Sequence, residues 1–281
     1  MKVFISADME GITGLVAWGQ CGRPNSDHYD FAFAREMITH DVNAAIRGAR
    51  KAGASEIVIK DSHGSSKNIL LKDLEPDVRL ISGYGCSHTD GMMEGIDDTF
   101  DAAMLIGYHA MAGTQAGIME HTIMGQIHRM KINGMPAGEI ALSAGVASSY
   151  GVPIVCVSSD FAGAAEAEKL LPGVSTAVVK TGLARYMGDC LHPSLTAPLI
   201  ENASELGCIK AKEIEPWRPF SPVTMSVEFN RSEEADAAGR LNGVVRPDTY
   251  TVEFTGKDYA EAHRVAWSIF SMGGLGAGAN T

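Results

Sequence analysis

The sequence predicts an α/β protein in which a mainly parallel sheet lies between two layers of helices, a three-layer α/β/α architecture. Two observations lead to this prediction. Short apolar runs alternate with longer segments of helical periodicity through the first two-thirds of the 281 residues. The pattern then changes to paired strand–helix units, which predicts a larger α/β domain over residues 1–190 and a smaller C-terminal α+β domain over 191–281.

The first two-thirds of the chain support the parallel sheet element by element. Residues 2–7 form a short apolar run before a glycine-containing segment, which is typical of a buried strand. Residues 28–52 carry apolar side chains at helical spacing and end at Gly53, which predicts a helix. The same reasoning predicts strands over 56–60, 102–107, 153–158 and 175–180, a hairpin about Asn133-Gly134, and helices over 138–150 and 163–171.

The last third of the chain is organised differently. A helix over 194–206 leads into the proline-rich stretch 216–222, which predicts a linker or rigid turn. Two similar units follow, each with a strand that contains Val-Glu-Phe and then a helix: 224–229 with a helix to 242, and 249–254 with a helix over 258–272. We expect the glycine-rich residues 273–278 to follow that helix as a tail, and not to form a phosphate-binding loop.

Composition excludes several classes of partner. The chain carries 34 Asp and Glu against 23 Lys and Arg, and the net charge of -11 disfavours nucleic acid as a partner. Its 5 cysteines are odd in number and form no Cys-x-x-Cys pair, which argues against a disulfide framework and favours reduced thiols. No apolar stretch reaches the length of a signal-peptide core or a membrane span, so we expect a cytoplasmic protein without a membrane partner.

Two acidic residues, Asp8 and Glu10, directly follow the first predicted strand. Residues two apart on a strand point to the same face, so both carboxylates can aim at one point. Two carboxylates held close together repel each other unless a proton or a cation lies between them. Because open α/β sheets place ligand sites at the carboxyl ends of their strands, this pair predicts a metal site.

Histidines follow two further predicted strands in the same way. His63 comes after the strand over 56–60, and His109 comes after the strand over 102–107. Adjacent strands lie about 4.8 Å apart, so side chains from neighbouring strand ends can share a metal. Imidazole together with carboxylate suits zinc and related metals, and the coincidence at three strand ends favours this reading over an ordinary turn or cap role for each residue.

Two more residues lie in segments that follow these strands. A glycine-containing, methionine-rich segment over 112–120 leads to His121, which spacing alone does not distinguish from a surface histidine. Glu139 opens the helix after the hairpin, a position where the helix dipole favours an acid without any metal.

Several motifs occur in fixed order from residue 1 to about 190: Asp-Met-Glu-Gly-Ile, Asp-Ser-His, Gly-Tyr-His-Ala, Met-Glu-His-Thr and Pro-Ala-Gly-Glu. This order resembles the M55 family of D-aminopeptidases. The resemblance implies an enzyme with two zinc ions per subunit that removes N-terminal residues, D-amino acids such as D-Ala among them, from short peptides or amides. It further implies a homo-oligomer, a decamer of two stacked five-membered rings. Carried over by motif, it makes His121 the catalytic residue and makes five residues the metal ligands: Asp8, Glu10, His63, His109 and Glu139.

The residues leave several alternatives open. His121 can attack the scissile carbonyl as an uncharged imidazole or serve as a general base or oxyanion donor. A metal-dependent amidohydrolase acting on non-peptide amides needs a similar site, and so does a binding or sensor protein without catalysis. The chain contains no His-Glu-x-x-His motif and no Gly-x-Ser-x-Gly motif, so a helix-borne zinc protease site and a serine hydrolase elbow are both disfavoured.

Overall fold

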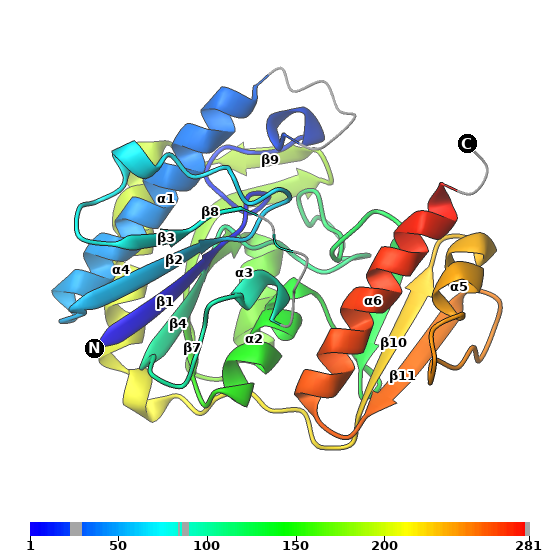
Figure 1. The fold of residues 1–281 in the computed structure, drawn as a ribbon. Coiled ribbons are helices and arrows are strands. Elements are labelled where there is room, and N and C mark those ends of the chain that lie inside the picture. The colour runs from blue at the N-terminus through cyan, green and yellow to red at the C-terminus, as the bar shows by residue number, and fades with distance from the viewer. Residues whose placement is uncertain (23–29, 84, 86–89, 279–281) are drawn as a thin grey trace.

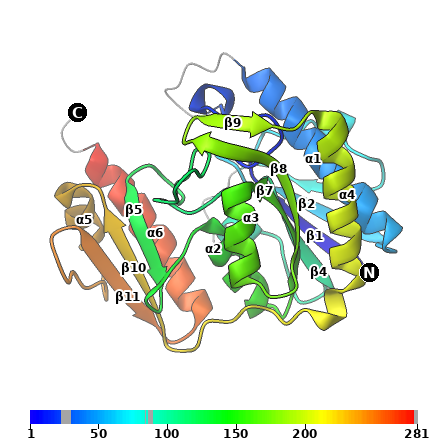
Figure 2. The ribbon, with the colours of Figure 1, turned by 180° about the vertical axis from the view of Figure 1, so that it is seen from behind.

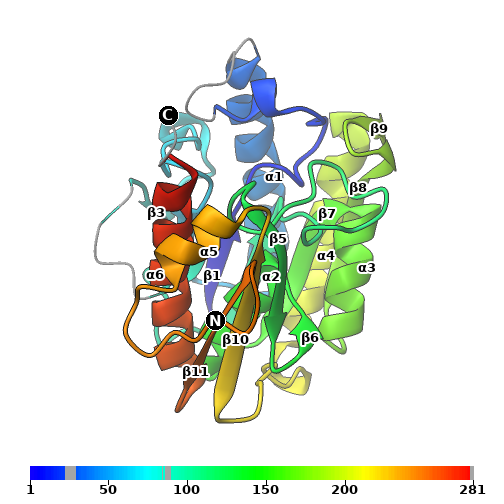
Figure 3. The ribbon, with the colours of Figure 1, turned by 90° about the vertical axis from the view of Figure 1, so that its right-hand side faces the viewer.

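The structure, a computed structural model, describes residues 1–22, 30–83, 85 and 90–278. This part of the chain forms one sheet of seven strands and one sheet of four strands. The large sheet with its covering helices lies on the left in Figure 1, and the small sheet lies on the right. Figure 3 looks at the molecule from the side of the small sheet.

The large sheet has the strand order β3-β2-β1-β4-β7-β8-β9, and its neighbouring strands are parallel except for β8 and β9. Its strands are β1 (Lys2–Ala7), β2 (Glu56–Asp61), β3 (Arg79–Ile81), β4 (Ala102–Ile106), β7 (Ile154–Asp160), β8 (Ser175–Ala184) and β9 (Met187–Cys190). The chain adds β2 and β3 on one side of β1 and adds β4 on the other. The strand order therefore reverses beside β1, and such a switch point is where open α/β sheets bind ligands.

Helices cover both faces of the large sheet (Figures 1 and 2). On one face α1 (Phe31–Lys51) packs against α4 (Pro193–Ile209), and α2 (Glu139–Ser149) and α3 (Phe161–Leu170) lie on the other. Val3 and Ile5 of β1 join the core under α1, whereas Phe4 points into the core on the opposite face, as strand alternation requires. The predicted three-layer α/β/α architecture is confirmed.

The small sheet is antiparallel, with the order β11-β10-β5-β6. Its strands are β5 (Ile127–Ile132), β6 (Met135–Pro136), β10 (Val223–Phe229) and β11 (Thr251–Gly256). Burial alternates along β10, because only one face of the sheet is covered, by α5 (Ser232–Ala238) and α6 (Tyr259–Ala277). The helix α6 also packs against α2, which joins the core of this sheet to the core of the large sheet.

Most predicted elements are present, with small shifts at their ends. The hairpin is confirmed at Asn133-Gly134, where both residues have positive φ angles. The helix predicted over 28–52 is α1, whose bounds are Phe31–Lys51; residues 28 and 29 of that prediction lie outside the described residues. The domain boundary after residue 190 remains a prediction, and β5 and β6 lie in the small sheet although they precede it.

The prediction of a glycine-rich tail was wrong, because α6 continues to Ala277. The glycines there serve close packing: a Cβ on Gly273 would lie 2.3 Å from the ring of Phe229, and one on Gly276 would lie 2.5 Å from the carbonyl oxygen of Glu233. The sequence pattern also missed β3 and β9, which are short strands at the two edges of the large sheet. None of the described helices combines the length and apolar character needed to cross a membrane.

Candidate metal centre

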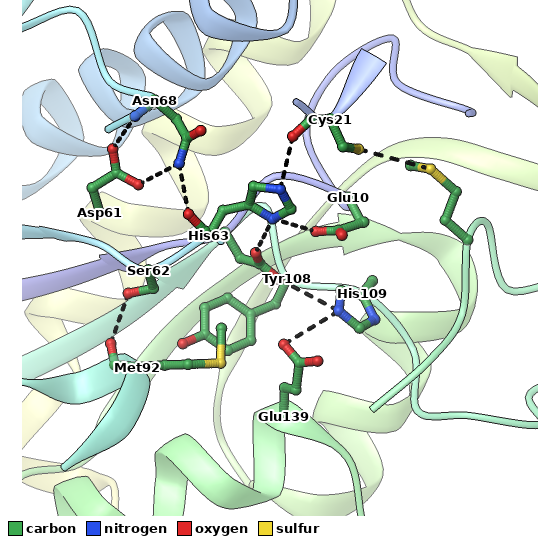
Figure 4. Close-up of polar contacts among 12 residues, drawn as sticks. Glu10, Cys21, Asp61, Ser62, His63, Asn68, Met92, Tyr108, His109 and Glu139 are labelled. Carbon is green, nitrogen blue, oxygen red and sulfur yellow. Dashed lines mark hydrogen bonds and ion pairs between the residues drawn. The ribbon is translucent and has the colours of Figure 1, made fainter. Parts of the chain in front are cut away.

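The structure brings all six predicted site residues together at the carboxyl edge of the large sheet: Asp8, Glu10, His63, His109, His121 and Glu139. Each is buried, with 1% to 6% of its surface exposed. They follow the ends of β1, β2 and β4, or lie in the loop before β5 and in the first turn of α2. Figure 4 labels four of them, Glu10, His63, His109 and Glu139, whose side chains point toward one another.

Two glycines let the loop after β1 approach the end of β4 closely. The amide of Gly11 donates to the carbonyl of Gly107 at 2.8 Å, and the amide of Asp8 donates to that of Ile106 at 2.8 Å. A Cβ on Gly11 would lie 1.7 Å from the carbonyl oxygen of Tyr108, so no other residue fits there. This contact places the acidic pair from β1 beside the histidine from β4.

A buried lysine is hydrogen-bonded to the same loop. Lys180 lies in β8 with 1% of its surface exposed, and burial lowers its pKa below the ordinary value. Its Nζ donates to the carbonyl oxygens of Glu10 at 2.6 Å, Ile12 at 2.8 Å and Leu15 at 2.6 Å, which uses all three ammonium donors. We infer that Lys180 positions the loop that carries Glu10, a role that sequence analysis missed, although it placed this lysine at the end of a predicted strand.

The imidazole of His63 faces the acidic pair with one nitrogen and the backbone with the other. Its Nδ1 lies 3.2 Å from Asp8 Oδ1 and 3.0 Å from Glu10 Oε2. Its Nε2 lies 3.0 Å from the carbonyl oxygen of Cys21, to which only a protonated Nε2 can donate. When the imidazole is neutral, as a metal ligand must be, that bond keeps the proton on Nε2 and leaves Nδ1 free to bind a cation.

The other two histidines repeat this arrangement with the nitrogens exchanged. His109 Nδ1 lies 3.0 Å from the carbonyl oxygen of Ala110, while its Nε2 lies 3.4 Å from Asp8 Oδ2 and 3.3 Å from Glu139 Oε2. His121 Nδ1 lies 3.0 Å from the carbonyl oxygen of Met119. The rings of His109 and His121 are stacked with their centroids 4.1 Å apart. Hydrogen bonds from a ring nitrogen to a backbone carbonyl oxygen commonly orient metal-ligating histidines in proteins.

The donor atoms are spaced as ligands of a bound cation would be. Zinc binds nitrogen and oxygen at about 2.0–2.2 Å, so two ligands of one tetrahedral zinc lie roughly 3.4 Å apart. The separations from His63 and His109 to the carboxylates, 3.0 to 3.4 Å, match this value. Two buried atoms, Asp8 Oδ2 and His109 Nε2, also have no hydrogen-bond partner among the described residues. The donor set therefore fits a metal ion.

Electrostatics favours a cation at this place. Burial and the charge of Glu10 raise the pKa of Asp8 to about 6. Burial acts to lower the pKa of His109, but the carboxylates of Glu139, Asp8 and Glu10 together outweigh it and raise the value to about 10. Without a metal, the carboxylates are thus balanced by protonated imidazoles. A divalent cation would supply the positive charge instead and leave the imidazoles neutral, which is the form that binds metals.

The two oxygens of Asp8 face the two halves of the cluster. Oδ1 faces His63 and Oδ2 faces His109. One set of donors within 4.8 Å of one another lies on each side, Glu10 with Cys21 and His63, and His109 with His121 and Glu139, and a third set, Asp8 with Glu10 and His109, joins the two sides. Asp8 therefore faces donor atoms on both sides of the cluster.

Two acids beside the predicted ligands serve the loops. The carboxylate of Asp61 accepts bonds from the amides of Asn68 and Ile69 at 2.6 and 2.9 Å, and the carboxylate of Glu120 accepts one from Gly113. Asn68 also donates from its side chain to the carbonyl oxygen of His63 at 2.8 Å (Figure 4). These bonds shape the loops around the cluster.

The cluster opens into a pocket of about 330 Å³. His121 lines this pocket, whereas His109 is not among its lining residues. Opposite the cluster, α6 contributes Trp267, Phe270 and Ser271, so the wall of the pocket comes from the small sheet's side of the molecule.

The fold and the cluster together define an α/β protein with a histidine–carboxylate metal centre at a topological switch point. A family model of D-aminopeptidases, Peptidase_M55, matches residues 1–268, and the chain belongs to this family. A D-aminopeptidase from Bacillus subtilis (strain 168) is 34% identical over 267 residues, which cover 94% of each chain. A solved structure, the Zn-dependent D-aminopeptidase DppA from Bacillus subtilis, described as a self-compartmentalizing protease, matches with a TM-score of 0.92 and 33% identity. The match covers 97% of this chain and 98% of that one.

Proposed function

We propose that this protein is a zinc aminopeptidase that releases N-terminal residues, D-amino acids such as D-Ala in particular, from short peptides. The observation that carries the proposal is the convergence of three oriented imidazoles and three carboxylates at the floor of a pocket. Family membership and the zinc dependence of the similar solved structure support it. The preference for D-residues and the choice of zinc come from these relatives.

Five residues would hold two zinc ions in this proposal. Asp8, Glu10 and His63 would hold one ion, while His109, Glu139 and the second oxygen of Asp8 would hold the other. Zinc supplies Lewis-acid polarisation of the scissile carbonyl and a site for the substrate amine when it is bound. The carbonyl oxygens of Cys21 and Ala110 keep two imidazoles in the ligating tautomer.

His121 would act on the substrate directly. It lines the pocket, and its Nε2 lies 3.8 Å from Glu10 and 3.7 Å from Glu139, farther than the ligand separations of the other two histidines. With Nδ1 donating to Met119, Nε2 carries a lone pair. That lone pair can attack the scissile carbonyl; the C–N bond then breaks, the shortened peptide leaves as a free amine, and water hydrolyses the acyl-histidine. Alternatively, it can take the proton of an attacking water.

A panel of D- and L-dipeptides and aminoacyl amides, assayed with zinc-loaded protein, tests the proposal. We expect release of the N-terminal residue, a preference for D-residues, and a loss of about 10²–10⁴-fold in kcat for His121→Ala with zinc content retained. His128→Ala, an exposed histidine on β5, is the matched control. Release from non-peptide amides alone would make the protein a different amidohydrolase, and zinc binding without any hydrolysis would make it a binding or sensor protein.

Mass spectrometry after rapid quenching separates the two roles of His121. An acyl adduct on the peptide that contains His121 supports nucleophilic attack. Turnover under the same quench conditions without any adduct supports the role of general base, because both routes place one solvent oxygen in the released acid and only the adduct distinguishes them.

We also propose that the chain assembles into a closed oligomer, a decamer of two stacked pentameric rings in the cytoplasm. The self-compartmentalizing relative supports assembly, and so do exposed apolar side chains on α4, among them Leu195 (54% exposed) and Ile209 (62%). Light scattering after size-exclusion chromatography should give ten times the mass of one chain. A monodisperse monomer would contradict the assembly.

A further inference from the structure

A second buried lysine lines the pocket beside the metal cluster. Lys60 lies at the end of β2, has 3% of its surface exposed, and belongs to the pocket lining together with Ser62 and Ser66. In strand alternation Lys60 and Ser62 share one face, and Ser62 bonds the carbonyl oxygen of Met92 on that face. Lys60 therefore lies on the side of the sheet that the pocket occupies.

The ammonium group of Lys60 is only partly satisfied by the protein. Its Nζ donates to the carbonyl oxygen of Asp61 at 2.7 Å and, over a long 3.4 Å, to that of Gly83. An ammonium has three donors, so one is uncommitted among the described residues. No carboxylate of the described residues lies within ion-pair distance, and burial lowers the pKa of Lys60 although Asp61 and Glu94 oppose this at longer range. A buried cation without a counter-ion is costly, so an anion brought by a ligand would stabilise it.

The distance to the cluster suits a short peptide. The Cα atoms of Lys60 and His63 are three positions apart in the chain, which is no more than about 10 Å at about 3.3 Å per residue of strand. A peptide spans at most about 3.5 Å per residue, so two or three residues cover this length. Apart from the histidines, Lys60 is the one basic side chain among the described lining residues.

We propose that Lys60 binds the C-terminal carboxylate of a peptide of two or three residues whose amino end lies at the metal cluster. The proposal rests on the aminopeptidase function proposed above and adds a rule of substrate choice. Free short peptides would be preferred over the same peptides with an amidated C-terminus.

The test compares the dipeptide D-Ala-D-Ala with its C-terminal amide, using the zinc-loaded full chain. We expect wild-type protein to hydrolyse the free acid with the higher kcat/KM. In Lys60→Met the ratio of kcat/KM for acid over amide should fall about 10- to 100-fold, mainly through KM of the acid, because the carboxylate is bound equally in the ground and transition states. Lys67→Met, which removes an exposed lysine from the following loop, should keep the wild-type ratio.

An unchanged ratio in Lys60→Met would overturn the proposal. If Lys60→Met does not fold by circular dichroism, the wild-type ratio decides, and a ratio of one or less contradicts the subsite. If neither compound is hydrolysed, the aminopeptidase function fails by itself. The subsite is then tested by calorimetric titration, where the acid must bind wild-type protein more tightly than the amide, and equal affinities would overturn it.

Discussion

The carboxyl edge of the large sheet and the inner face of α6 border the same pocket, but they bring different chemistry to it. The edge contributes the buried carboxylates and imidazoles. In each imidazole, one ring nitrogen is hydrogen-bonded to a backbone carbonyl oxygen. The helix contributes Trp267, Phe270 and Ser271, none of which ionises in the accessible pH range. One region is suited to hold metal and the other to select side chains, so substitutions in the two regions should affect different measurements.

The largest effect is expected for Asp8→Asn, because the amide removes a charge that both halves of the cluster face. We expect zinc content to fall by at least half and kcat/KM to fall by about 10³-fold or more, since both of the proposed zinc ions would use this carboxylate. Metal analysis and peptide hydrolysis measure the two losses. Full zinc content with near-normal hydrolysis would show that Asp8 does not bridge the site.

Lys180→Met tests whether the metal cluster depends on the hydrogen bonds that Lys180 makes to the loop after β1. The substitution leaves three carbonyl oxygens without their donor, so the free energy of unfolding should fall by about 3 kcal/mol. Zinc affinity should weaken about 10- to 100-fold, because a ligand-bearing loop loses its positioning. Chemical denaturation and zinc titration measure these effects, with the exposed Lys169→Met as control. A loss of stability with unchanged zinc affinity would limit Lys180 to a structural role.

Glu166 on α3 provides a test of how the free energy of unfolding depends on pH. Burial raises the pKa of this carboxyl to about 7, while Oε2 accepts a bond from the amide of Met111 at 2.8 Å. Because the folded pKa lies above the unfolded value, ionisation costs stability as pH rises from about 4.5 to 7, and the cost persists above that. Glu166→Gln should therefore raise the free energy of unfolding by about 1–3 kcal/mol at pH 8 and change it little at pH 4.5. A loss of stability at pH 8 would contradict this.

The smallest effect is expected on the other side of the pocket. Trp267→Phe replaces one pocket-lining ring with a smaller one and changes no candidate metal ligand. KM for peptides should therefore change by about 2- to 10-fold, with a different order of preference among substrate side chains. Zinc content should stay at the wild-type value. A loss of zinc in this variant would show that the two regions are not separable.

The two regions also differ in how much of each could be predicted from the sequence. The ends of β1, β2 and β4 were predictable because each is a short apolar run followed within three residues by Asp8, His63 or His109, a pattern contained in a few residues. The parallel sheet then places such ends at one edge.

The rest of the pocket depends on contacts between distant segments. Lys180 reaches a loop about 170 positions away in the chain, and Trp267 reaches the pocket only because α6 packs against α2. Gly273 and Gly276 looked like a tail, because their packing against Phe229 and Glu233 is not visible in a local pattern. Local motifs therefore predicted the candidate ligands. The residues that position these ligands and those that form the pocket wall could be identified only from the structure.

The most direct test of the central claim is the metal content of the purified wild-type protein. After zinc loading and exhaustive dialysis, mass spectrometry of the metal should give about two zinc ions per chain, one for each side of Asp8, as a two-metal site requires. A folded protein that retains no zinc would contradict the metal centre. One ion per chain, with full peptide hydrolysis, would contradict the two-metal arrangement.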